Sequence, residues 1–233
     1  MSQKSDLLIR IPSGSSEAQV TLTDDRGVEA HKTVVMDSLI SNLTSSFKFS
    51  TGLLPNNTRF FSGTATDYII GIESPSRVRR FLRSSYTTRS SGKLPNELKI
   101  PFPTCLFVFY VKGIKIRNTR VFSLRSPLSR SNDVMSRFPF GNTYQDGKVC
   151  WGSAKLPSIS NPMMLVSCIA TFYDAPFNGD LFDRQTFNRP LDTDIASDFW
   201  SLLAYLNGKG TFPQEMLRDL RVNLNNIMRD PNV

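Results

Sequence analysis

Few side chains in this sequence could do covalent chemistry: its 233 residues include three cysteines and one histidine. A Ser-His-Asp or Cys-His mechanism would have to use His31, and no G-x-S-x-G nucleophile elbow occurs. The cysteines form no C-x-x-C pair and one histidine cannot complete a zinc finger, so we expect free thiols and no metal site. The glycine-rich motifs that bind nucleotide phosphates are also absent, and we therefore expect no cofactor.

The most informative arrangement lies in residues 138–153. Cys150 follows Asn142 by eight residues, and the Asp146-Gly147 pair between them is typical of a turn. A cysteine taken alone is more often a small buried residue than a nucleophile, and asparagine, aspartate and glycine favour turns for local reasons. Turn formation explains each residue singly, but it does not explain the spacing to Cys150.

The elements that must position this segment begin with β structure. Alternating apolar residues on both sides of an Asp/Gly turn predict a hairpin over 17–35, and apolar spacing near 3.6 predicts a helix over 36–52. Strands are expected at 58–62 and 67–72, where the second is rich in β-branched and aromatic residues. A loop rich in Ser, Thr and Arg follows at 84–96.

The strongest strand signal is residues 106–111, which turn at Lys112-Gly113 and return over 114–124. Consecutive apolar residues predict a central strand that is buried on both faces. Cys105 begins this strand and Cys168 lies among apolar residues of a predicted helix, so both are expected to be inert core thiols.

Three helices are predicted in the last third of the chain. The first would be capped by Ser160, with Pro162 in its first turn. The second is an apolar stripe over 195–206 that stops at Gly208. The third would begin at a capping box formed by Thr211 and Gln214.

Strands first and helices last favour an α+β fold, with helices against one face of an antiparallel sheet. We expect one elaborated domain over 1–233, with a hairpin-and-helix extension at 1–57. Residues 58–233 would hold the sheet, the Cys150 segment and the C-terminal helices. The longest apolar run is too short to cross a membrane and no signal-peptide block is present, so a cytoplasmic location is expected.

The formal net charge of +8 is unevenly distributed along the chain. Residues 77–137 carry fourteen Lys or Arg against two acids, and the remainder is net negative. A solvated face, or a face for an acidic protein partner, is favoured over a nucleic-acid patch, although nucleic acid stays an alternative. The candidate partner-binding residues in the densest part are Arg77, Arg79, Arg80 and Arg83.

The segment that holds Cys150 resembles the active-site segment of ubiquitin-conjugating enzymes. In those enzymes a His-Pro-Asn triplet precedes the thioester-forming cysteine at the same distance. The run Asn-x-Tyr-x-x-Gly-x-x-Cys occurs here at Asn142, Tyr144, Gly147 and Cys150. The whole segment is more similar still to the prokaryotic ubiquitin-conjugating-like family D, known as protein B of the PRTRC plasmid system, and weaker similarity covers roughly residues 20–185.

The resemblance implies a ubiquitin-conjugating-like fold and a transferase. Cys150 would accept a ubiquitin-like protein as a thioester from a ThiF-like adenylating enzyme and pass it to an amine. The Asn142 amide would support the developing oxyanion, or the loop that holds it. The family's gene neighbours further imply a JAB-type metalloprotease as a partner, in a plasmid-maintenance or antiviral-defence cassette.

This chain departs from the eukaryotic pattern at the residues before Asn142. Phe140 and Gly141 stand where those enzymes have histidine and proline, and phenylalanine cannot make the histidine's hydrogen bonds. We expect burial of the Phe140 ring to hold the loop instead. The alternative function is a catalytically inactive scaffold that binds protein or nucleic acid through the basic middle region.

Overall fold

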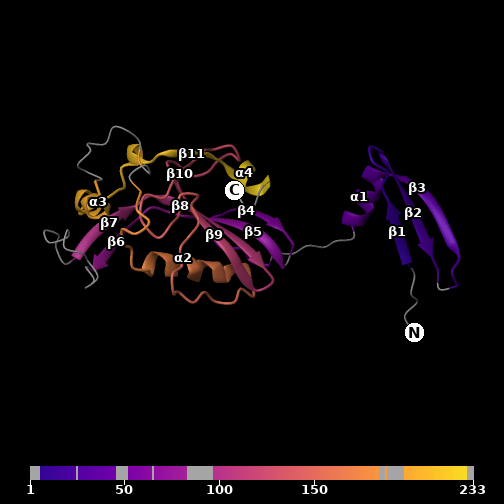
Figure 1. The fold of residues 1–233 in the computed structure, drawn as a ribbon, viewed down its shortest axis with the longest axis horizontal. Helices are drawn as coiled ribbons and strands as arrows, with labels where there is room; N and C mark the ends of the chain where they lie inside the picture. Colours follow the sequence, from indigo (N-terminus) through magenta and orange to yellow (C-terminus); the bar gives the residue numbers. More distant parts are fainter. Residues whose placement is uncertain are drawn as a thin grey trace. The chain divides into compact units, whose positions relative to one another are not determined.

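The structure is a computed structural model that describes residues 6–24, 26–45, 52–64, 66–82, 97–183, 187 and 197–229. The chain divides into two compact units, Met1–Ser50 and Thr51–Val233 (Figure 1). In the described part of the chain, no helix is long and apolar enough to cross a membrane.

The first unit is a three-stranded antiparallel sheet with one helix. Its elements are β1 (Asp6–Arg10), β2 (Glu17–Thr23), β3 (Glu29–Val35) and α1 (Met36–Ser45). The predicted hairpin is confirmed as β2 and β3, because Thr23 pairs with Glu29 across the turn. The Asp24 carboxylate accepts the Val28 and Arg26 backbone N–H groups, and these bonds lower the pKa of Asp24. β1 was not predicted, and the end of the predicted helix lies outside the described residues.

The second unit is built on a six-stranded antiparallel sheet in the order β11-β10-β9-β8-β5-β4. The strands are β4 (Thr58–Gly63), β5 (Asp67–Ser74), β8 (Thr104–Lys112), β9 (Lys115–Leu124), β10 (Met135–Arg137) and β11 (Asp219–Val222). The four strands expected between 58 and 124 are therefore confirmed.

The β5–β8 pair continues into a two-stranded ladder of β6 (Arg77–Leu82) and β7 (Glu97–Phe102). Ser74 pairs with Cys105 at the end of the first ladder, and Arg77 pairs with Phe102 at the start of the second. Arg77, Arg79 and Arg80 thus lie on β6, which pairs only with β7 among the described residues. The predicted loop at 84–96 lies outside the described residues.

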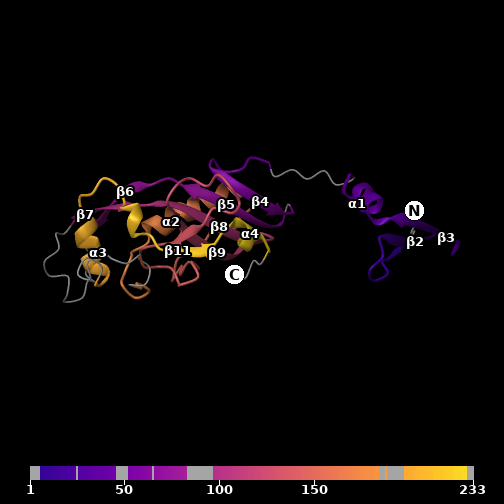
Figure 2. The same cartoon turned by 90° about the horizontal axis from the view of Figure 1, so that it is seen from above.

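The six-stranded sheet has an apolar cluster on each face, because alternate residues of a strand point to opposite sides. Phe107 and Phe109 face the cluster that includes α2 (Leu165–Asp174) and α3 (Phe199–Leu206). Leu106 and Val108 face a second cluster that includes α4 (Leu224–Arg229). The predicted central strand, buried on both faces, is confirmed. The prediction that all helices pack on one side is wrong, because α4 covers the face opposite α2 (Figures 1 and 2).

The predicted start of the first C-terminal helix is also wrong in detail. A 3₁₀ turn over Pro162–Met164 precedes α2, its N-cap is Asn161, and that cap makes no side-chain hydrogen bond. The Ser160 hydroxyl instead contacts the Met164 sulfur at 3.2 Å. The inward positions of α2 are nevertheless as expected, because Phe172 is buried.

The two remaining helical predictions differ in outcome. The second is confirmed as α3, which is capped by the Asp198 carboxylate on the Ser201 N–H at 2.8 Å. The third is wrong: residues 214–229 form a 3₁₀ turn, β11 and the short α4. Pairing with β10 accounts for this, because the Arg137 N–H donates to the Arg218 carbonyl at 3.0 Å and β11 completes the sheet.

Candidate functional site

Cys150 comes directly after a small hairpin. The Tyr144 N–H donates to the Lys148 carbonyl at 2.9 Å, and the Gly147 N–H donates back to the Tyr144 carbonyl at 3.0 Å. Gly147 has a φ of 82°, and a Cβ at this position would lie 3.0 Å from the Val121 carbonyl oxygen. The predicted Asp-Gly turn is confirmed, and glycine is required there because a side chain would be both strained and crowded.

The hairpin is anchored on β9, and this brings Cys150 and Asn142 together. The Val149 N–H donates to the Thr119 carbonyl of β9 at 2.8 Å. At the next residue, the Cys150 N–H donates to the Asn142 carbonyl, also at 2.8 Å. Eight residues separate the two in sequence, but the hairpin between them folds back so that their backbones are in direct contact.

Asn142 adopts a left-handed backbone with a φ of 67°. Its side-chain Nδ2 donates to the Pro176 carbonyl at 3.0 Å. At Gly141, a Cβ would collide with the Asn178 carbonyl. The chain that follows α2 therefore packs tightly against the residues that lead into the hairpin, and the Asn142 amide joins the two.

The Phe140 ring holds this loop from inside the core, as expected. Phe140 is 2% exposed, and its ring centroid lies 4.4 Å from that of Phe102. Phe138 and Phe177 also contact the ring. Trp151, next to the cysteine, packs with its edge on Phe172 at 6.2 Å between centroids. Aromatic packing of Phe140 thus takes the place of the hydrogen bonds that a histidine side chain would make at this position.

The three cysteines differ in exposure. Cys150 is half-buried, whereas Cys105 and Cys168 are fully buried. Burial raises the pKa of the Cys105 thiol to about 12 and raises the pKa of Cys168 as well. The neighbouring Cys150 sulfur raises the pKa of Tyr144, because a sulfur that can accept the phenol hydrogen favours the protonated phenol.

Alkylation of the folded protein tests this difference. We expect iodoacetamide at pH 8 to modify Cys150 alone, because the buried thiols are closed to solvent and Cys105 stays protonated well above that pH. Mass spectrometry of tryptic peptides should show one carbamidomethyl group per native chain and three after unfolding in denaturant. Equal labelling of Cys168 in the native protein would contradict the described burial.

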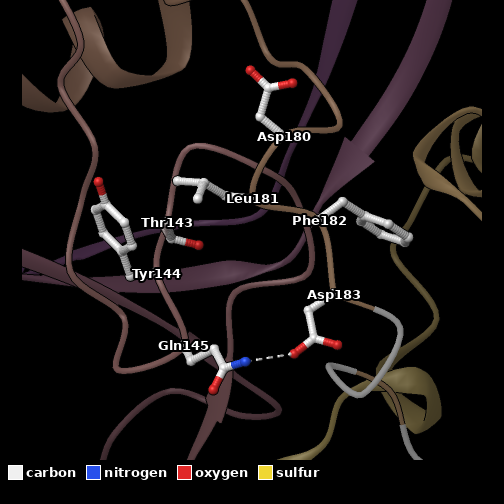
Figure 3. Close-up of a pocket in the computed structure, with 7 residues that line it drawn as sticks. All are labelled: Thr143, Tyr144, Gln145, Asp180, Leu181, Phe182 and Asp183. Atoms are coloured by element: carbon white, nitrogen blue, oxygen red, sulfur yellow. Dashed lines mark hydrogen bonds between the residues drawn. The ribbon is translucent and has the colours of Figure 1, made fainter.

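An open hollow of about 630 Å³ lies beside the hairpin (Figure 3). Tyr144 and Gln145 form one wall, and residues 180–183 form the other. The Gln145 amide donates to the Asp183 carboxylate at 3.3 Å across the hollow. Arg137 donates to the same carboxylate at 3.0 Å and to the Gln145 carbonyl at 3.3 Å. This clamp ties the hairpin to the chain after α2.

The sequence did not single out Arg137, Asp183 or Tyr144 as functional candidates. Asp183 lies 38 residues after Gln145, and no fixed spacing links the two positions. The only available signal was that Tyr144 shares the segment of Cys150 and Asn142.

Three of the four predicted partner-binding arginines lie on β6, in different environments. The Arg77 guanidinium lies over the Tyr173 ring at 4.3 Å. Arg79 is 3.6 Å from the Asp174 carboxylate, and burial lowers its pKa. The Arg80 side chain is 75% exposed and lies 3.4 Å from the Glu97 carboxylate. Arg83 lies outside the described residues.

The described residues contain no cluster of three His, Cys, Asp or Glu side chains that could hold a metal ion. A family model described as prokaryotic E2 family D matches residues 36–220 of the chain. No curated protein and no solved structure matches it significantly. The matched range includes Asn142, Cys150 and the clamp formed by Arg137 and Asp183.

Proposed function

The chain belongs to prokaryotic E2 family D, and from this we propose that it is a conjugating-type transferase that carries a ubiquitin-like protein as a thioester on Cys150. A ubiquitin-conjugating-like fold and a ThiF-like adenylating partner are parts of the same proposal. A PRTRC or defence cassette, with a JAB-type metalloprotease, is the genetic context in which we expect it to act.

One observation carries the proposal. Cys150 is the cysteine that the fold leaves accessible, and it is fixed by its N–H bond to the Asn142 carbonyl at 2.8 Å. The Tyr144 hydroxyl lies beside the sulfur, where it can donate a hydrogen bond to the group that attacks and later leaves. A buried structural cysteine would need neither the exposure nor the donor.

The proposed function comprises two acyl transfers. The Cys150 thiolate attacks the thioester carbonyl of the loaded adenylating enzyme, and the thiolate of that enzyme leaves. An acceptor amine then attacks the new thioester, the Cys150 thiolate leaves, and the amine loses a proton as the amide forms. Each step passes through an oxyanion. The Asn142 amide has two hydrogens, and only one is donated to the Pro176 carbonyl, so we propose the second as an oxyanion donor.

The experiment that tests the proposal is incubation with the cognate adenylating enzyme, the ubiquitin-like protein and ATP, followed by non-reducing electrophoresis. We expect an adduct that disappears on addition of a thiol reductant. A protein that folds and binds both partners but never forms the adduct would support the alternative, a scaffold without catalysis.

The arginines of β6 give a separate prediction about partner docking. Arg80→Ala should slow thioester loading a few-fold at low salt and leave the melting temperature unchanged, because an exposed charge acts mainly on association rate. Arg79→Ala should instead cost about 1 kcal/mol of stability, since Arg79 packs over the Phe81 ring and pairs with Asp174.

Loading time courses at several salt concentrations, with thermal melts, distinguish the two variants. If Arg80→Ala loads normally but loses tight, sequence-tolerant binding of DNA, β6 binds nucleic acid and the protein-docking assignment is wrong.

A further inference from the structure

The β1–β3 sheet has little core of its own. Among the described residues of the first unit, only Ala18 is fully buried. Leu7, Leu8 and Leu22 are 57%, 65% and 46% exposed. This sheet precedes residues 36–220, the range that the family model matches. Large apolar side chains left exposed on a small sheet indicate an interaction surface.

β1 is an edge strand of this sheet. It pairs with β2 on one side, and among the described residues no strand pairs with its other side. Edge strands are normally protected against further pairing by central charges, proline or bulges. The centre of β1 is instead Leu7-Leu8-Ile9 with a regular ladder to β2, so its outer backbone N–H and C=O groups can accept another strand.

The sequence of β1 is complementary to itself in the antiparallel direction. If a second copy of the strand pairs about Leu8, each Leu7 lies opposite Ile9 of the other copy, and each Asp6 lies opposite Arg10. Asp6 and Arg10 are exposed, and neither side chain has an ion-pair partner among the described residues. Three apolar pairs, Leu7–Ile9 twice and Leu8–Leu8 at the centre, would thus be flanked at each end by an Asp6–Arg10 ion pair.

We propose that two copies of this protein associate through β1 and form one continuous six-stranded sheet. The two-fold axis would pass between the Leu8 residues, perpendicular to the sheet. The register of β1 on β2 places Leu7 opposite Leu22 and Ile9 opposite Val20, on one face. Pairing therefore joins the apolar faces of both copies. A five-residue strand buries less than a standard interface, so the dissociation constant should be on the order of micromolar.

The order of charges favours a second copy over an unrelated strand. Ion pairs across a two-fold axis at Leu8 need an acid at one end of β1 and a base at the other, at equal distances from Leu8. Asp6 and Arg10 meet this condition. An unrelated acidic or basic partner would be matched better by a single sign of charge. The proposal does not depend on Cys150 or on thioester transfer.

Charge reversal in the full-length protein tests the pairing. Asp6→Arg places like charges opposite each other across the axis, and so does Arg10→Asp. Each single variant should raise the dimer dissociation constant by about tenfold or more. The double variant Asp6→Arg/Arg10→Asp should dimerise like the wild type. An equimolar mixture of the two single variants should form a heterodimer, because their strands are then complementary.

Sedimentation equilibrium of the wild type and variants measures these constants, and thermal melts verify that each variant is folded. Glu29→Arg reverses a charge on β3, at the other edge of the sheet, and should leave dimerisation unchanged. A wild type that stays monomeric up to about 200 µM, well above a micromolar constant, would overturn the proposal. Failure of the mixture to restore association would also overturn it. If the wild type is a monomer and the single variants lose thioester loading, β1 binds another protein and the proposal is wrong.

Discussion

Cys150→Ala is expected to abolish the reductant-sensitive adduct, because no other accessible thiol among the three can accept the acyl group. The side chain is half-buried and the backbone bond to Asn142 does not involve the sulfur, so the variant should fold normally. Cys150→Ser keeps the size and replaces the sulfur with oxygen. We expect it to load slowly and to give an ester that survives reductant but is cleaved by hydroxide.

The matched controls are Cys105→Ala and Cys168→Ala. Both side chains are fully buried, so each variant loses core packing and some stability, but each should retain the adduct at temperatures where it is folded. Electrophoresis with and without reductant, on samples whose folding is verified by circular dichroism, measures all four variants. An adduct that persists in Cys150→Ala and vanishes in Cys168→Ala would show that Cys168 is the thioester-forming residue.

The parts of the fold that could be predicted are those in which local pattern and tertiary structure agree. Residues 106–111 read as a central strand because every side chain is apolar, and β8 is indeed buried on both faces. Residues 214–229 could not be assigned correctly, since leucines spaced by three or four suit an amphipathic helix. Pairing with β10, a contact more than 80 residues distant, converts part of this segment into a strand.

The candidate site also contains features that local sequence predicts and features that depend on distant contacts. The turn at Gly147 and the burial of Phe140 follow from residue types close in sequence, and both are confirmed. The clamp of Arg137 on Asp183 joins positions 46 residues apart through an ion pair of 3.0 Å. No local rule selects one aspartate among several, so such contacts emerge only when the chain after α2 is placed against the hairpin.

Replacement of Asn142 is expected to slow discharge of the Cys150 thioester to amines by about 10², the effect of removing one oxyanion donor. Two variants separate this role from the support of the loop. Asn142→Gly removes the amide but tolerates the φ of 67°, whereas Asn142→Ala removes the amide and also strains the backbone by about 1 kcal/mol. Both lose the bond to the Pro176 carbonyl.

If the amide stabilises the transition state, the two variants should load normally, discharge equally slowly, and differ mainly in melting temperature, with Asn142→Ala the lower. Single-turnover discharge of preloaded protein to free lysine measures the rate, and differential scanning fluorimetry measures the stability. A glycine variant that discharges at the wild-type rate per folded molecule while melting lower would show that Asn142 acts only through its bond to Pro176. In that case the oxyanion donor must be sought elsewhere, and the Tyr144 hydroxyl beside the sulfur is the next side chain to replace.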